Sequence, residues 1–325
     1  MSPTLTGPWV IAGPAPAIAR LEPLLAARRA AGEVSVWVGD AGEFAATPGR
    51  FLPRGAAGVL LVGDKRRSPG RVLPGLFLHE NDGRPVPAGW LPDVGAPLAT
   101  YAATAARVLA RPREDRSLVV LGQWEDRFLR VGLRTERWME KHGHADAVFN
   151  WTADRISRTD MIAGLRHGPA LALYFGHGRP RGWAGYHGVR TDHFERPWTE
   201  PVAALLALCC ENASRHHTGL SFAERLVLTG VCGAMLAAVT KTRHEDNRRW
   251  GPELCEAFTE ESPATLAELV AGADVAPRFK TQTAYRFIGD PLMPLAGAEG
   301  ATRAAAHVFA PAPDEALPPW EDAPV

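Results

Sequence analysis

The sequence predicts an α/β fold in which helices flank a mostly parallel sheet. Short apolar runs alternate with segments of helical periodicity along most of the 325 residues. One run, residues 58–62, is continuously apolar, as expected for a strand that is buried on both faces. Hydrophobic residues make up 46% of the chain and charged residues 22%, so the sequence can bury a sizeable core.

The first 115 residues are predicted to form an N-terminal α/β subdomain that ends in a linker. The segments with strand or helix patterns are, in order, strands at 9–12, 34–38 and 58–62 and helices at 18–31 and 98–109. Residues 64–97 are rich in proline and glycine and have no clear period. We therefore expect a long connection there.

Residues 116–298 are predicted to form a second α/β subdomain. Its strand patterns lie at 118–121, 147–150, 170–175, 202–208 and 233–239, and its helical patterns at 128–142, 159–168 and 252–258. Ser221 and Glu224 have the spacing of a capping box, in which each side chain satisfies a free amide of the other residue. The remaining residues, 299–325, are predicted to be a Pro-rich, disordered tail.

Charge and composition exclude several classes of function. Lys and Arg together number 36 and balance 36 Asp and Glu, so no nucleic-acid partner is expected. No apolar stretch is long enough to span a bilayer, and the N-terminus lacks the pattern of a signal peptide, so we expect no membrane partner. Four cysteines are too few for a disulfide scaffold in a chain of this size, and no CxxC pair indicates a structural zinc site or a thioredoxin-type redox motif. These features favour a reduced, cytoplasmic protein.

Chemically reactive residues follow two of the predicted strands where each ends. His177, flanked by glycines, follows the strand at 170–175, and Cys209 and Cys210 follow the strand at 202–208. Functional groups gather at the carboxyl ends of parallel strands, so an imidazole and a thiol on neighbouring strands could cooperate there. An imidazole can activate a thiol as a nucleophile, and a glycine lets a backbone N–H approach a developing oxyanion.

Other interpretations of the same residues stay open. A histidine after a strand can be an ordinary loop residue, and two cysteines after an apolar run can both be buried structural thiols. A dinucleotide-binding loop is not favoured, because Arg181 stands where the G-x-G-x-x-G motif requires its third glycine. A zinc site is not favoured either, because adjacent cysteines rarely ligate one ion.

Several segments together resemble the caspase-like cysteine peptidases of clan CD, and among them the gingipain-type family. The main matches are YFGHG at 174–178 with Trp183 after it, and Cys210-Glu-Asn212 after an apolar strand. Further matches follow in the order of that family: LLVGD at 60–64, LPDV at 91–94, SFAER at 221–225 and FIGDP at 287–291. The resemblance extends from about residue 8 to 295. It implies a caspase-haemoglobinase-like fold whose catalytic subdomain is 116–298.

The resemblance also implies an activity and a set of site residues. The activity is that of a cysteine endopeptidase that cleaves peptide bonds through a thioester acyl-enzyme, with no metal or organic cofactor. His177 would be the catalytic base and Cys210 the nucleophile, because the family's nucleophile is followed by one residue and then Asn or Thr. The backbone amides of Gly178 and Cys210 would form the oxyanion hole. Glu125 is the candidate that orients His177, with Asp126 as the alternative.

The substrate and the partners are less defined by the resemblance. A protein or peptide substrate is expected, and any regulatory protein partner is unknown. Asp126 would favour a basic residue before the scissile bond, whereas Arg127 or Arg130 would favour an acidic one, and Trp183 is a further candidate for substrate binding. A hypothesis from another functional class is a catalytically silent caspase-like domain that binds or regulates a partner. The intact histidine and cysteine argue against it.

Overall fold

The computed structural model describes residues 7–142, 148–195, 197–273 and 282–308. The N-terminal half supplies the strands β1 (Trp9–Gly13), β2 (Val34–Val38), β3 (Gly58–Asp64), β4 (Phe77–His79) and β5 (Pro85–Asp93). Its helices are α1 (Ala15–Ala19), α2 (Glu22–Ala31), α3 (Ala41–Ala46), α4 (Pro48–Phe51), α5 (Pro69–Val72) and α6 (Pro97–Leu109).

The second half supplies the remaining elements. Its strands in the main sheet are β6 (Leu118–Gly122), β7 (Val148–Asn150), β8 (Leu171–Phe175), β12 (Val202–Leu208), β13 (Cys232–Ala238) and β14 (Tyr285–Gly289). Its helices are α7 (Asp126–His142), α8 (Arg158–Leu165), α9 (Phe222–Leu228), α10 (His244–Glu260), α11 (Leu266–Gly272) and α12 (Ala301–His307). A separate small sheet contains β9 (Gly178–Arg179), β10 (Gly182–Trp183) and β11 (Val189–Arg190).

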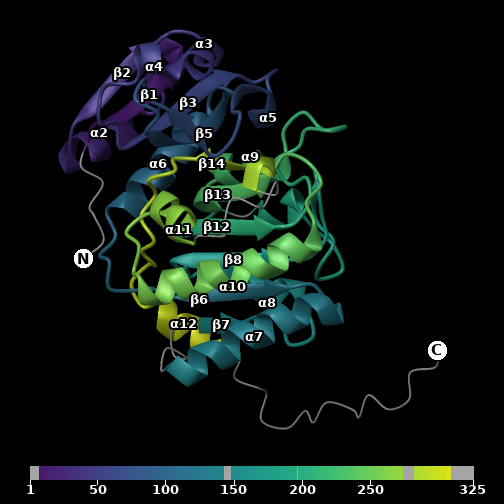
Figure 1. Cartoon of the computed structure of the whole chain (residues 1–325). Helices are drawn as coiled ribbons and strands as arrows, with labels where there is room; N and C mark the ends of the chain where they lie inside the picture. Colours follow the sequence, from purple (N-terminus) through teal and green to yellow (C-terminus); the bar gives the residue numbers. More distant parts are fainter. Residues whose placement is uncertain (1–6, 143–147, 196, 274–281, 309–325) are drawn as a thin grey trace, which may run out of the picture.

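One long sheet joins the two halves (Figure 1). In the described residues its strand order is β2-β1-β3-β5-β14-β13-β12-β8-β6-β7, with β4 paired to β5 at the side. Neighbouring strands are parallel within each half, except that β4 is antiparallel to β5 and β14 is antiparallel to β13. The mostly parallel sheet flanked by helices confirms the predicted fold class.

The strand β14 reverses the direction of the sheet between the halves. It is parallel to β5 on one side and antiparallel to β13 on the other. The strands β1, β2, β3 and β5 therefore run opposite to β13, β12, β8, β6 and β7. As a consequence, the carboxyl ends of the latter five strands meet at one edge of the sheet, and those of β1, β2, β3 and β5 lie at the opposite edge.

A buried ion pair holds α2 against the segment that follows β14. Asp290 is fully buried, and its carboxylate accepts hydrogen bonds from the Arg28 guanidinium at 2.6 and 2.9 Å and from the Trp9 indole at 3.1 Å. The Asp290 backbone N–H donates to the Tyr101 hydroxyl at 2.8 Å. The FIGDP segment thus attaches the end of the strand β14 to three elements of the N-terminal half, β1, α2 and α6.

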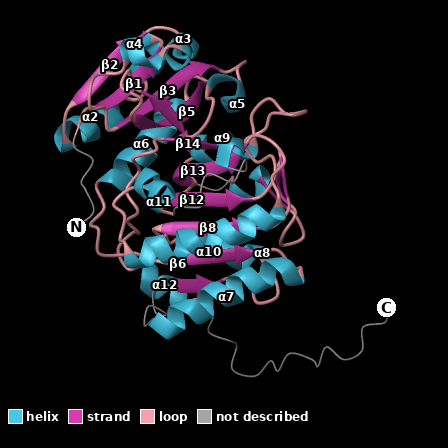
Figure 2. Cartoon of the chain, viewed as in Figure 1, coloured by secondary structure: helices cyan, strands magenta, loops and turns pink. Residues whose placement is uncertain are grey.

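The helices α7, α10 and α11 lie together on the near face of the second half (Figure 2). The helix α10 contacts both α7 and α11, and α6 and α9 contact each other and β13. Within the described residues, none of the helices combines the length and the hydrophobicity that a bilayer crossing requires.

Two of the predicted elements differ from the structure. The prediction of a long connection at 64–97 is wrong, because β4 and the central strand β5 lie inside it. The prolines of β5 mask its strand pattern, and Gly89 is needed because a Cβ there would lie 2.0 Å from the Gly289 carbonyl oxygen. The helix predicted at 18–31 is divided into α1 and α2, because Pro23 stands in the first turn of α2 and cannot continue α1.

Other predicted elements are present with small shifts of their ends. The helix predicted at 252–258 is the second half of the longer α10. The Ser221–Glu224 capping box forms at the start of α9. The prediction of a disordered tail from residue 299 is wrong for residues 301–307, which form α12 with Ala301 and Ala305 buried. Residues 309–325 lie outside the described residues.

Replacement of Arg28 by Gln is expected to lower the free energy of unfolding by about 3–5 kcal/mol, because it leaves the buried Asp290 carboxylate without its cation. Urea denaturation followed by circular dichroism measures the difference. Arg29→Gln is the matched control, since Arg29 pairs with Glu22 at the surface, where an ion pair contributes about 0–1 kcal/mol. Equal losses in the two variants would contradict the role of the buried pair.

Candidate functional site

The two strand ends predicted to carry chemistry lie side by side. The strands β8 and β12 are neighbours in parallel register, with Leu208 opposite Phe175, and β6 flanks β8 with Gly122 opposite Phe175. The arrows of β12 and β6 point to the same side of the sheet (Figure 2). The residues that follow these strands, among them Gln123, therefore leave the sheet at one level of one edge.

The backbone of His177 is fixed by three hydrogen bonds. Its N–H donates to the Gln123 side-chain oxygen at 2.7 Å. Its carbonyl accepts from the Ala184 N–H at 2.9 Å and from the Tyr174 hydroxyl at 3.1 Å. Three elements (the end of β6, β8 and the small sheet) thus define where the histidine stands.

The His177 ring is half-exposed and lies among residues of the α7 N-terminus. Its Nε2 is 2.5 Å from an Arg127 Nη2 and 3.4 Å from a Glu125 carboxylate oxygen. Because a guanidinium only donates, Nε2 is the acceptor in this contact. The Phe128 ring packs edge-on against the imidazole, with centroids 5.5 Å apart. Glu125 in turn accepts hydrogen bonds from Gln123 at 2.7 Å and from Arg127 at 2.9 Å.

The Cys210 thiol is partly exposed and contacts the segment that follows β13. The Thr242 N–H donates to Sγ at 3.3 Å, and the carbonyl and hydroxyl oxygens of Thr242 lie 3.6 and 3.7 Å from Sγ. The Asn247 amide donates to the Thr242 hydroxyl, and the Tyr285 hydroxyl donates to Asn247. Within the described residues no hydrogen bond joins the thiol directly to His177.

Cys209 differs from its neighbour in burial and in contacts. Its side chain is buried, and its Sγ lies 3.0 Å from the Asn212 side-chain oxygen. Burial raises the pKa of the Cys209 thiol well above its ordinary value, and burial does the same to Cys232 and Cys255. Of the four cysteines, which are all free, Cys210 is the one with partial exposure.

Asn212 attaches the small sheet to the end of β12. Its side-chain amide donates to the carbonyls of Arg179 at 2.8 Å and Gly182 at 3.1 Å, and its oxygen accepts from the Trp183 indole at 2.7 Å. Asn212 is fully buried. The asparagine two residues after Cys210 therefore has a structural reason for its place, since it fixes the hairpin that carries Gly178.

Gly178 lies against the backbone of the cysteines. A Cβ at this position would lie 2.3 Å from the Cys210 carbonyl oxygen and 2.5 Å from the Cys209 Sγ, so a side chain has no room. Gly178 lies opposite Trp183 in the antiparallel pairing of β9 and β10. Because the Ala184 N–H donates to the His177 carbonyl, the preceding pair is hydrogen-bonded, and the pair of Gly178 and Trp183 is therefore not hydrogen-bonded. The Gly178 N–H consequently points away from β10.

The other predicted site residues have different surroundings. Asp126 is 86% exposed in its side chain and pairs with Arg130 at 3.3 Å. Trp183 is buried and stacks on Tyr174 with ring centroids 4.3 Å apart, so it supports the hairpin from inside the core. Gln123 and Thr242 also contact the site, although neither was predicted from the sequence. Both follow the carboxyl ends of strands in the same sheet, β6 and β13, which is the signal in the sequence that could have identified them.

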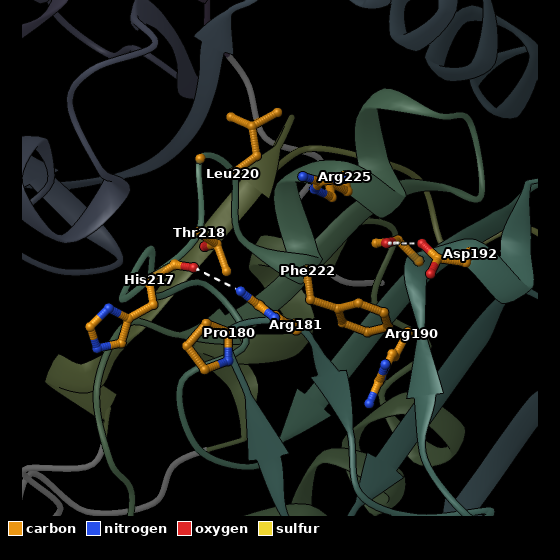
Figure 3. A pocket seen from close by; sticks show the side chains of 11 residues that line it. Pro180, Arg181, Arg190, Asp192, His217, Thr218, Leu220, Phe222 and Arg225 are labelled. Carbon is orange, nitrogen blue, oxygen red and sulfur yellow. Dashed lines mark hydrogen bonds between the residues drawn. The ribbon is translucent and has the colours of Figure 1, made fainter.

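A cavity lies beyond the small sheet (Figure 3). It has a volume of about 330 Å³ and is lined by Arg181, Arg190 and Arg225 together with Phe222 and the loop before α9. The Arg181 guanidinium donates to the His217 carbonyl at 3.3 Å. The residues that line this cavity make none of the contacts to the His177 ring or to the Cys210 thiol described above.

Comparison with known proteins agrees with this architecture. The fold is similar to the Arg-specific cysteine proteinase gingipain R (RGPB), with a TM-score of 0.71, 15% identity and coverage of 90% of this chain and 79% of that chain. It is also similar to a complex of the pro- and mature domains of RgpB from Porphyromonas gingivalis (TM-score 0.67, 17% identity, 89% and 80%). A structure described as a protease is similar as well (TM-score 0.64, 12% identity, 88% and 78%).

The fold and the sequence define a cysteine peptidase, a hydrolase of the gingipain type. The sequence profile of peptidase family C25 matches residues 128–296, more than half of the chain. The chain belongs to peptidase family C25. No curated protein sequence matches it significantly. Membership of this family confirms the resemblance found in the sequence and does not favour a catalytically silent domain.

Gly178→Ala is expected to lower turnover of a denatured protein substrate such as casein by about 10²–10³-fold, because the added methyl group displaces a proposed oxyanion donor from Cys210. Its unfolding free energy should fall by about 1–3 kcal/mol, as for other insertions into close contacts. Gly219→Ala is the control, since a Cβ there meets nothing within 4 Å. Wild-type turnover and stability in Gly178→Ala would refute the close approach.

Proposed function

We propose that the protein is an endopeptidase in which Cys210 is the nucleophile and His177 the general acid–base. The observation that carries this proposal is the meeting of two strand ends at Gly178, where the backbone of the histidine segment lies against the Cys210 carbonyl. This contact brings a partly exposed thiol and an imidazole to one edge of the sheet.

Two backbone amides are available to bind the substrate oxygen. The Gly178 N–H points away from β10, and among the described residues no backbone hydrogen bond uses the Cys210 N–H. Donors of this kind stabilise an oxyanion without reorganisation during the reaction. The N–H of Thr242, which already points at the Cys210 sulfur, stabilises the thiolate in the same way.

The reaction then follows with balanced steps. The Cys210 thiolate adds to the carbonyl carbon of the scissile bond, and the protonated imidazole gives its proton to the leaving amine. The products of this step are a thioester and a free amino terminus. Water then adds to the thioester while His177 accepts its proton, and collapse releases the carboxylate product and the thiol.

Glu125 and Arg127 have opposite effects on the His177 ring in this mechanism. The Glu125 carboxylate, 3.4 Å from Nε2, pairs with the imidazolium that the first step requires. The Arg127 guanidinium at 2.5 Å instead donates to Nε2 and occupies the lone pair that would accept a proton. The ion pair between Glu125 and Arg127 couples the two effects. We therefore assign Glu125 to orienting and charge-stabilising His177.

Cys210→Ala is expected to abolish cleavage of casein while leaving the circular dichroism spectrum and the unfolding midpoint unchanged, because the partly exposed thiol contributes little packing. Cys209→Ala is the matched control and should retain most activity, since the thiol it removes is buried and protonated at neutral pH. Activity in the Cys210 variant together with an inactive Cys209 variant would reverse the assignment of the nucleophile.

Thiol labelling tests the pairing of Cys210 with His177 without any substrate. At pH 7 iodoacetamide should modify Cys210 much faster than the other three cysteines, whose burial raises their pKa values and limits access. Peptide mass spectrometry identifies the modified residue, and the rate should fall in His177→Ala. Four thiols should titrate in the denatured, unreduced protein, as we propose for a cytoplasmic enzyme. Slow, equal labelling of all four would contradict the catalytic pair.

A further inference from the structure

A cavity lined by arginines opens between α7 and α10. Its volume is about 310 Å³. The residues that line it are four arginines and two apolar residues: Arg127, Arg130, Arg134, Arg248, Val131 and Pro252. We call this cavity the arginine pocket. Four guanidinium groups and two apolar side chains suit a short side chain that ends in a carboxylate.

The acidic residues near the arginine pocket leave its walls cationic. Glu125, Asp126 and Glu245 pair with Arg127, Arg130 and Arg248, but none of these carboxylates lines the cavity. Arg134 is exposed, and within the described residues no ion pair includes it. Both α7 and α10 are 17 residues long and begin next to the cavity, so their N-terminal dipoles add to the positive potential.

The histidine at the start of α10, His244, lies in the field of the same arginines. Burial lowers the pKa of His244, and the positive charges of Arg127 and Arg248 lower it further. Neutral His244 does not compete with the arginines for an anion. The positive charge of the region therefore resides mainly on guanidinium groups, which bind carboxylates through two parallel hydrogen bonds.

The arginine pocket adjoins the proposed catalytic histidine. Arg127 lines the pocket and at the same time donates to His177 Nε2 at 2.5 Å. The Phe128 ring packs edge-on against both His177 and His244, with centroid distances of 5.5 and 5.0 Å. One lining residue of the pocket, Arg127, thus contacts the residue that would protonate the leaving group.

We propose that the arginine pocket binds the carboxylate of an aspartate or glutamate adjacent to the scissile bond, so that the enzyme cleaves beside acidic residues. This inference rests on the proposed function of His177 and Cys210. The sequence left open whether the substrate residue is basic, through Asp126, or acidic, through Arg127 or Arg130. The inference favours the acidic residue, because both arginines line the cavity and Asp126 does not.

Binding of an acidic side chain would also act on catalysis. In the structure the Arg127 guanidinium is shared between Glu125 and the His177 Nε2. A substrate carboxylate in the arginine pocket competes for that guanidinium and withdraws it from Nε2. The nitrogen is then free to accept a proton while Glu125 stays close to it. Acidic substrates should therefore raise kcat as well as lower KM.

Pairs of fluorogenic peptides that differ only in charge provide the test. Glu is compared with Gln, and Asp with Asn, first on the acyl side and then on the leaving side of the scissile bond. We expect kcat/KM to be about 10–100-fold higher for the acidic member on one of the two sides, as for other charge-assisted hydrogen bonds. Arg and Lys at that position should be the poorest substrates.

Arg134→Gln should reduce the acid preference, which is the ratio of kcat/KM for the Glu peptide to that for the Gln peptide, about tenfold. Arg134→Glu should reduce it further. Arg190→Gln is the matched control, because it removes an exposed arginine that lines the cavity beyond the small sheet (Figure 3) and does not line the arginine pocket. An equal loss in Arg134→Gln and Arg190→Gln would mean general electrostatic attraction and would overturn the inference.

The remaining outcomes separate this inference from the proposed function. Fast labelling of Cys210 and cleavage of casein, without acid preference on either side, would overturn the arginine pocket alone. A preference for Arg or Lys would do the same. Cleavage of no peptide, together with slow and equal labelling of all cysteines, would overturn the proposed function and this inference with it.

Discussion

The close contact between Gly178 and the Cys210 carbonyl is the constraint on which the candidate site depends. It is possible because position 178 has no Cβ and because Asn212 holds the hairpin through two carbonyls and the Trp183 indole. In the same geometry the Gly178 N–H points away from β10, and the buried Cys209 thiol lies beside the glycine. The proposed oxyanion donor, the buried thiol and the partly exposed thiol thus belong to one backbone arrangement.

The environment of the histidine has a different origin. Its backbone is fixed by Gln123 and by the small sheet, whereas its ring contacts the first turn of α7. A rigid backbone with a half-exposed ring lets neighbouring charges change the state of the imidazole without moving the chain. Glu125 and Arg127 supply both signs of charge within 3.4 Å of one nitrogen. The site can therefore respond to an incoming anion through one side chain.

The sequence predicted the parts of this arrangement that depend on local patterns. The strands that precede His177 and Cys210 are continuous apolar runs, and the parallel α/β pattern alone brings their ends together. The central strand β5 was not predicted because its prolines mask the strand pattern. Its Gly89 is required by a close contact with the distant Gly289 carbonyl, which the sequence does not show. The arginines of α7 could be seen in the sequence, but their shared cavity required Arg248, which lies more than a hundred residues away along the chain.

The position of β14 has a consequence for the order of assembly. This strand comes from residues 285–289, yet it lies in the middle of the sheet between β5 and β13. During synthesis both of those strands keep an unpaired edge until residues 285–289 have emerged, and open edges invite pairing with other chains. Such long-range closure also slows folding. The last strand of the described residues is thus the one that merges two separate half-sheets, so a chain that ends before it would lack both the continuous sheet and the buried Asp290 pair.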